Sequence, residues 1–265
     1  MSQNQPIKTK RNSRIIRASI LLGSLGLVAA FLLTRPISDP FEGTAVTDPP
    51  FTPLTYSIQT FLWWDENHAG SQLDTVYRIL NFSHVKQTFA WRDMELEAGV
   101  WDFSESDRVV AQAEARDLQL IARLGQVPNW AAQVPLEVTN DEQHDTPPAD
   151  LDQWANYCGT IAERYRGQIA AYQIWNEPNL SREWGDLPPD ALAYVEVLAA
   201  CSAAIRAVDP DAILISAGLS PTGQNNDLAQ PDDVYLDAMY RAAFQQHIDV
   251  VGVHAPGYGK PPSYG

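Results

Sequence analysis

Short β-rich runs alternate with longer segments of helical periodicity along most of this chain. Apolar residues recur at three- and four-residue steps in the helical segments. The β-rich runs are shorter and lack this helical spacing. The runs cover residues 56–62, 85–91, 118–124, 169–175, 212–217 and 249–254. Strands that alternate with helices in this way are typical of a parallel sheet with helical crossovers. The sequence therefore predicts an α/β domain with about six βα units.

Two helices are predicted with particular clarity. The first has an apolar stripe formed by Leu151, Trp154, Cys158, Ile161 and Tyr165. The second covers residues 192–205 and ends before Pro210. Ser104 and Asp107 have the spacing of a capping box, which predicts that another helix begins at Ser104.

The two cysteines, Cys158 and Cys201, fall on these two separate helices. Isolated cysteines often behave as small buried hydrophobes, so we expect two buried thiols. A disulfide between them is the alternative, and it requires that the domain is exported.

The N-terminal part of the chain has the composition of an export segment followed by a linker. Residues 1–17 are polar and basic, and residues 18–34 contain a long run without charge. We predict a signal anchor there, with a cleaved signal peptide as the alternative, because no small-x-small cleavage site follows the run. Residues 35–55 are rich in proline and read as an extended linker, so the globular domain is expected to span residues 56–265. The predicted location is extracytoplasmic and anchored to the membrane, or secreted if the segment is cleaved.

The charge of the chain is strongly negative and unevenly distributed. The whole chain carries a formal charge of −15, with 18 basic and 33 acidic residues, and residues 1–35 contain six basic residues and no acid. The remaining 12 basic and 33 acidic residues give −21 for residues 36–265. Such a surface repels phosphate backbones, so nucleic acid is excluded as an expected partner. A neutral ligand such as a sugar remains compatible with it.

A carboxamide and a carboxylate, Asn176 and Glu177, stand at the end of the fourth predicted strand, immediately before Pro178. In a sheet built from βα repeats this end faces the ligand crevice. Glu177 is therefore a candidate for acid/base chemistry, although a glutamate here can also cap the next helix. The eight tryptophans provide aromatic faces that suit a carbohydrate cleft, and we expect about half of them in the core.

Segments after three consecutive strands resemble the (β/α)8 glycoside hydrolases of clan A, nearest to the β-xylosidase-like family 39 and its relatives. The fourth-strand signature is Trp175-Asn176-Glu177-Pro178-Asn179. The segments Trp91-Arg92-Asp93-Met94-Glu95 and Pro128-Asn129-Trp130 are similar to those after the second and third strands of these enzymes. The resemblance covers residues 56–258 and implies a TIM barrel that hydrolyses β-linked glycosides with retention of configuration.

The resemblance also implies roles for individual residues. Glu177 would be the acid/base, and Asn176 would hydrogen-bond the sugar 2-hydroxyl. Further substrate contacts are expected from Arg92, Trp64, Trp130, His254 and Tyr258. For Arg92 a surface salt bridge with Asp93 or Glu95 is the alternative. The paired acids Asp65 and Glu66 are expected to form a solvated loop.

The nucleophile is expected after a seventh strand, and the sequence reaches Gly265 before any seventh βα unit. We therefore expect a barrel truncated to about six units, most simply a fragment of a longer reading frame. A shortened protein that closes its gap by self-association is the alternative, and the sequence leaves the oligomeric state open.

Two functions are compatible with these features. The first is a retaining glycoside hydrolase that acts on a carbohydrate substrate, and the second is a non-catalytic carbohydrate-binding or cell-surface protein derived from such a barrel. Because His68, His84, His144 and His247 show no mutual metal-ligand spacing, neither a metal site nor a cofactor is expected.

Overall fold

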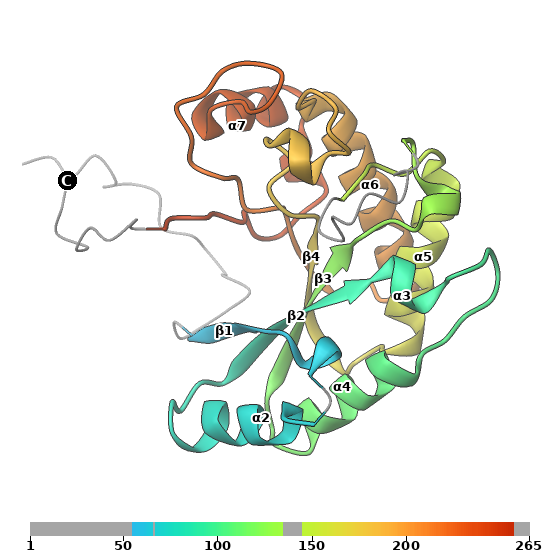
Figure 1. The fold of residues 1–265 in the computed structure, drawn as a ribbon, viewed down its shortest axis with the longest axis vertical. Coiled ribbons are helices and arrows are strands. Elements are labelled where there is room, and N and C mark those ends of the chain that lie inside the picture. The colour runs from blue at the N-terminus through green and yellow to red at the C-terminus, as the bar shows by residue number, and fades with distance from the viewer. Residues whose placement is uncertain (1–54, 66, 135–144, 257–265) are drawn as a thin grey trace, which may run out of the picture. The chain divides into compact units, whose positions relative to one another are not determined.

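Five parallel strands form a single sheet in the order β1-β2-β3-β4-β5, and helices cover its outer side (Figure 1). This computed structural model describes residues 55–65, 67–134 and 145–256. They belong to one compact unit. The predicted basic segment, the hydrophobic segment at 18–34 and nearly all of the linker lie outside the described residues. Those assignments therefore stay predictions, as does the contribution of Tyr258.

The elements follow one another as the alternating pattern predicts. The strands are β1 (Ser57–Thr60), β2 (His84–Ala90), β3 (Gln119–Gly125), β4 (Ile169–Ile174) and β5 (Ile213–Ile215). The α-helices are α2 (Ala69–Arg78), α3 (Trp91–Met94), α4 (Ser104–Glu114), α5 (Leu151–Arg164), α6 (Ala191–Val208) and α7 (Asp232–Arg241). Short 3-10 turns are η1 (Leu62–Trp64), η2 (Asn129–Ala131), η3 (Ser181–Glu183) and η4 (Phe244–Gln246).

The two faces of the sheet differ in polarity, which separates the core from the site. Val85 and Phe89 on β2 are fully buried beneath the helices. On the opposite face, Lys86 of β2 donates a hydrogen bond to the side chain of Gln173 on β4, at 3.0 Å. Arg123 of β3 shares this face, because it lies opposite Gln173 in the parallel register. The inner face therefore carries polar groups that lie toward the C-terminal ends of the strands.

Helices α5 and α6 carry the strongest predictions, and both are confirmed. Asp150 caps α5 by accepting a hydrogen bond from Asp152 N, and Asp190 caps α6 by accepting from Leu192 N and Ala193 N. Helix α6 is long and apolar enough for a membrane span by length and composition alone, with a mean hydropathy of 1.6. Its apolar residues instead pack in the core, where buried Val197, Leu198 and Ile205 are found.

The cysteines form a disulfide, so the expectation of two buried thiols is wrong. Cys158 of α5 and Cys201 of α6 are bonded, with their Cα atoms 5.3 Å apart. Both residues are fully buried at the contact between the two helices. This pairing depends on tertiary packing, because the way α5 and α6 cross determines which of their residues come into contact.

The sixth predicted strand is wrong in extent. Residues 249–254 run parallel to the end of β5 but form only isolated bridges, Ile215 with Val250 and Leu219 with Val253. Gly252 N donates to the Ser216 hydroxyl, at 3.0 Å, instead of to a backbone carbonyl. A backbone ladder cannot continue through a side-chain acceptor, so the segment stays irregular.

The predicted capping box is also wrong. Helix α4 does begin at Ser104, but its N-cap is Phe103, which makes no side-chain capping bond. Ser104 N instead donates to the Asp102 carboxylate, at 2.9 Å. Asp107 turns away and pairs with Arg164 of α5, at 2.6 Å, which is a tertiary contact that the local pattern does not encode.

Candidate active site

The segment after β4 is held in a strained backbone conformation. Trp175 and Glu177 have φ values of 72° and 41°, in the left-handed region that side-chain-bearing residues rarely occupy. Trp175 N donates to Leu124 O at 3.0 Å, and Glu177 N donates to Gly218 O at 3.1 Å. The loop is thereby tied to β3 on one side and to the segment after β5 on the other. Strain of this kind clusters at functional sites.

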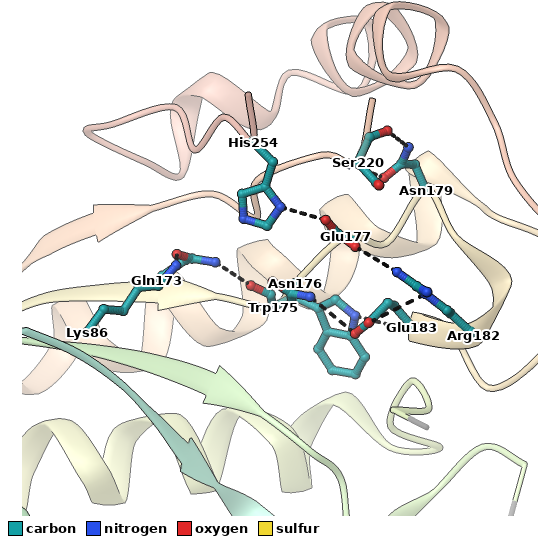
Figure 2. A network of polar contacts seen from close by, with 10 residues as sticks. All are labelled: Lys86, Gln173, Trp175, Asn176, Glu177, Asn179, Arg182, Glu183, Ser220 and His254. Carbon is teal, nitrogen blue, oxygen red and sulfur yellow. Dashed lines mark hydrogen bonds and ion pairs between the residues drawn. The ribbon is translucent and has the colours of Figure 1, made fainter. Parts of the chain in front are cut away.

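The Glu177 carboxylate is held by two side chains that can carry positive charge (Figure 2). His254 Nδ1 lies 2.7 Å from Glu177 Oε1, and an Arg182 guanidinium nitrogen donates to Oε2 at 3.4 Å. Burial by itself raises the pKa of Glu177, but the hydrogen bond and charge of His254, aided by Arg182, outweigh it. The net result is a pKa below the ordinary value for glutamate. The structure thus brings together two residues that the sequence predicted, Glu177 and His254.

The contact between Glu177 and His254 depends on a glycine. A Cβ atom at Gly218 would lie 2.3 Å from the His254 ring, which is closer than any real contact. The same glycine supplies the carbonyl that accepts from Glu177 N. Gly218 therefore allows the imidazole to lie directly beside the loop of the candidate acid/base.

A pocket of about 440 Å³ opens beside Asn176 at the C-terminal ends of the strands. Its lining residues are Phe61, Trp64, Thr88, Arg92, Arg123, Leu124, Gly125, Gln126, Asp145, Trp175, Asn176 and Glu183. We call this the main pocket. The residues come from β2, β3 and the segments that follow β1 through β4, as expected for a βα site at this end of the sheet.

The structure distributes the predicted substrate contacts unevenly. Trp64, Arg92 and Asn176 line the main pocket. Trp130 does not, because its indole Nε1 donates to Glu95 O at 2.9 Å and its ring packs against Trp91. Trp130 therefore lies at the edge of the core, against the buried ring of Trp91, and not in the main pocket.

The acidic pair after the first strand plays a local role in its described half. Asp65 accepts from His68 at 2.8 Å and from the Gln72 side chain at 2.7 Å, near the start of α2. This agrees with the expected solvated loop. Among the described residues, no group of three or more His, Cys, Asp or Glu is arranged to hold a metal ion.

Trp64 and Phe61 form an exposed aromatic rim on the pocket. Their exposed fractions are 51% and 59%, and their ring centroids lie 6.4 Å apart. Exposed aromatic faces beside a polar pocket suit stacking on sugar rings. Most of the other tryptophans are buried, and Trp91, Trp154 and Trp175 form one aromatic cluster in the core.

Three charged residues of the main pocket were not predicted from the sequence: Arg123, Asp145 and Glu183. A signal for Arg123 does exist, since a cation interrupts an otherwise apolar strand at an inward-facing position. Asp145 gives no local signal, because it lies in an irregular segment. Burial raises the pKa of Glu183, with a smaller opposing effect from the Asn176 hydrogen bond.

Asp145 joins two segments of the pocket wall. Its carboxylate accepts from Gln126 N at 2.8 Å, from Val127 N at 3.2 Å and from Thr146 N at 3.0 Å. Gly185 N, after η3, donates to the Asp145 backbone carbonyl. Burial raises the pKa of this carboxyl to about 6, although the backbone donors oppose the shift. Asp145 thereby fixes the segment that follows β3 against the segment that follows β4.

A second, more open hollow of about 420 Å³ lies on the other side of the loop that follows β4. Arg182 lines it, together with Ser220, Thr222 and Gln224. The buried Asn179 side chain donates to Ser220 O and Gln230 O, at 2.8 and 2.9 Å, and so ties the segment after β4 to the segment after β5. The segments that follow β3 and β5 therefore both line hollows at this end of the sheet.

Comparison with known proteins identifies sequences and folds to which this chain is similar. The sequence model of the family "Cellulase (glycosyl hydrolase family 5)" matches residues 49–248. An endo-1,4-beta-xylanase A from Phanerodontia chrysosporium is 32% identical over 126 residues, which is 47% of this chain and 29% of that protein. A beta-xylosidase from Geobacillus stearothermophilus is 25% identical over 130 residues, 45% of this chain and 25% of that protein. The chain thus spans less than a third of these relatives.

Solved structures show the same fold. A monomeric beta-xylosidase from Caulobacter crescentus CB15 superposes with a TM-score of 0.58 at 19% identity, covering 77% of this chain and 42% of that chain. A family 39 glycoside hydrolase from Bacteroides cellulosilyticus WH2 gives 0.54 at 18% identity, covering 75% and 37%. At such identities the similarity shows a shared TIM-barrel-like fold and no more. The family match, which covers most of the chain, shows that this protein belongs to the clan A glycoside hydrolases, in the cellulase family, family 5.

Proposed function

We propose that this chain carries the acid/base half of a retaining β-glycoside hydrolase, with Glu177 as the proton donor. The observation that carries the proposal is the position of Glu177 three residues after β4, next to Asn176, which lines the main pocket. In a retaining hydrolase one carboxylic acid protonates the leaving oxygen while a second carboxylate attacks the anomeric carbon. We assign no described residue to that second role, so the test uses the intact protein.

The other predicted residues take supporting roles in this proposal. Asn176 hydrogen-bonds the sugar in the pocket, and Arg92 contacts its hydroxyl groups. Trp64 stacks on a sugar ring at the exposed rim. His254 holds the Glu177 carboxylate in place. The similar proteins are a xylanase and a xylosidase by name, so β-1,4-linked xylosides are the first substrates to test.

The test compares leaving groups. Glu177→Gln removes the acidic proton with little change in size, and aryl β-xylosides with poor leaving groups depend on that proton. We expect their hydrolysis to fall about 10²- to 10⁴-fold, whereas dinitrophenyl xyloside should lose much less in its glycosylation step. Glu196→Gln on the exposed face of α6 is the matched control and should behave as wild type. Equal losses for both classes of leaving group would contradict the assignment.

Binding without turnover has a separate meaning. If the intact wild-type protein were retarded by soluble xylan in affinity electrophoresis but hydrolysed no β-glycoside, the non-catalytic carbohydrate-binding function would replace the enzyme. Retardation and turnover together support the hydrolase.

We also propose that the chain acts outside the cytoplasm, held at the membrane by residues 18–34. The basic residues 1–17 before an uncharged run support this orientation, and the Cys158–Cys201 disulfide suits an oxidising compartment. On cell fractionation the protein should appear in the membrane fraction. Protease added to intact spheroplasts should digest its domain. A domain protected until lysis would contradict the proposal.

A further inference from the structure

Glu183 occupies a position in the main pocket that its neighbours fix rigidly. Its backbone carbonyl accepts a hydrogen bond from the indole Nε1 of Trp175, at 2.9 Å. The next residue, Trp184, is 2% exposed and packs edge-on against Trp175, with ring centroids 5.3 Å apart. Glu183 is therefore attached to the same buried aromatic residue that precedes Asn176. This attachment holds both side chains in a constant relation to each other.

The Glu183 carboxylate contacts Asn176 directly. Asn176 Nδ2 donates to Glu183 Oε2 at 3.2 Å, as Figure 2 shows. The Glu183 side chain is only 21% exposed, and it lines the pocket together with Asn176. Arg182 and Arg123 supply nearby positive charge, with an Arg182 nitrogen 3.9 Å from Glu183 Oε1. Burial raises the pKa of Glu183, while the Asn176 hydrogen bond and the two arginines favour its ionised form.

The chemistry of the pair determines which way the amide points. The two ends of an asparagine amide have nearly the same shape but opposite hydrogen-bonding character. An ionised carboxylate only accepts hydrogen bonds, so it selects the orientation in which Nδ2 faces Glu183. The other amide proton and the Asn176 carbonyl oxygen are then left in a defined arrangement for a ligand. Preorganised donors of this kind stabilise a transition state without reorganising during the reaction.

We propose that Glu183 is a positioning residue that fixes the amide of Asn176 for sugar binding in the main pocket. This inference rests on the proposed function of Asn176 and adds a residue to which no role in this site has been assigned. Glu183 does not itself touch the reacting atoms. It acts only through Asn176.

A double-mutant cycle in the intact protein tests this coupling. Glu183→Ala should lower kcat on an aryl β-xyloside about tenfold with little change in KM. The reason is that a misplaced Asn176 amide loses its hydrogen bond to the sugar mainly in the transition state. In an Asn176→Ala background the same change should have almost no further effect. Equal losses in both backgrounds, or no loss in either, would overturn the proposal. Glu196→Ala serves as the control for removing a glutamate from a helix surface.

A second measurement does not depend on activity. In the wild-type protein the side-chain amide NMR signals of Asn176 should shift as Glu183 titrates, and this shift should be absent in Glu183→Gln. Asn176 signals that titrate identically in both proteins would refute the contact. If the contact is found but the wild type hydrolyses no glycoside, the proposed function fails while the positioning role stands. Unchanged thermal unfolding of the variants shows that the loss is not one of folding.

Discussion

Glu177 is held between a histidine and an arginine, and these contacts affect the pH range over which its carboxyl holds a proton. A general acid works only while it is protonated, so a lowered pKa confines its activity to more acidic solutions. The structure lowers the pKa of Glu177 mainly through His254 and less through Arg182. The negative charge of a second carboxylate near the bound sugar would oppose this effect, as in other carboxylate pairs.

The first prediction concerns the basic limb of the activity profile. His254→Ala removes the hydrogen bond and the charge that lower the Glu177 pKa, so burial becomes the dominant effect. The basic limb of kcat/KM for a substrate with a poor leaving group should move to higher pH. Arg182→Ala should move it in the same direction by less. A shift to lower pH in His254→Ala would contradict the proposed role of Glu177.

A second residue-scale prediction concerns Asp145 and stability. Its pKa is about 6 when folded against an ordinary value of 3.8, so between these values the folded state binds a proton that the unfolded state has lost. Stability therefore falls as pH rises through this window, by on the order of 3 kcal/mol for a shift of this size. Asp145→Asn should remove this part of the pH dependence.

Urea unfolding at pH 4 and pH 7 measures the effect of Asp145. The difference between wild type and Asp145→Asn should change between the two pH values, because other titrating groups are common to both proteins. Asp211→Asn, at an exposed turn, is the control and should show no such change. An identical pH dependence in Asp145→Asn and wild type would disprove the assignment.

Among the contacts between elements, the packing of α5 against α6 gives the main support to the candidate active site. The two helices pack along their length, and Trp154 of α5 donates its indole Nε1 to Val197 O of α6, at 2.9 Å. Trp154 also packs against Trp175, directly before Asn176. The position of the candidate acid/base loop thus depends on how these helices pack against β4.

The disulfide in this contact gives the element-scale prediction. Replacing both Cys158 and Cys201 by alanine should lower the free energy of unfolding by about 2–4 kcal/mol, since the bond restricts the unfolded chain. Urea unfolding with and without a phosphine reductant measures this loss. The reductant should destabilise the wild type and leave the double variant unchanged. A wild type indifferent to reductant, under conditions where free thiols are detected, would count against a stabilising bond.

At the scale of the whole molecule, the parallel sheet separates two environments. The outer face, under the helices, holds the aromatic and aliphatic core, whereas the inner face carries Lys86, Arg123 and Gln173. Burial, and to a smaller extent the charge of Arg123, lowers the pKa of Lys86 to about 8. At the C-terminal ends of the strands this polar face meets the loops, and the main pocket lies at that junction.

The pattern of apolar residues was enough to predict the elements and their order. Alternating periodicity predicts β1 through β5 and the helices between them, because the spacing of apolar side chains is a local property of each element. The motif at Asn176 and Glu177 also indicated the strand end and, by resemblance, clan A of the glycoside hydrolases. Asn176, Arg92 and Trp64 line the main pocket, and each lies within four residues of the end of a strand, while their roles in substrate binding stay predictions.

Which distant residues meet depends instead on how the elements pack. The Cys158–Cys201 bond, the contact of Asn176 with Glu183 and the bracing of the pocket by Asp145 all join segments through packing. The irregular segment at 249–254 likewise depends on the Ser216 hydroxyl rather than on its own apolar pattern. Local periodicity encodes each element's direction and buried face, but the positions of side chains on neighbouring elements follow from how those elements pack.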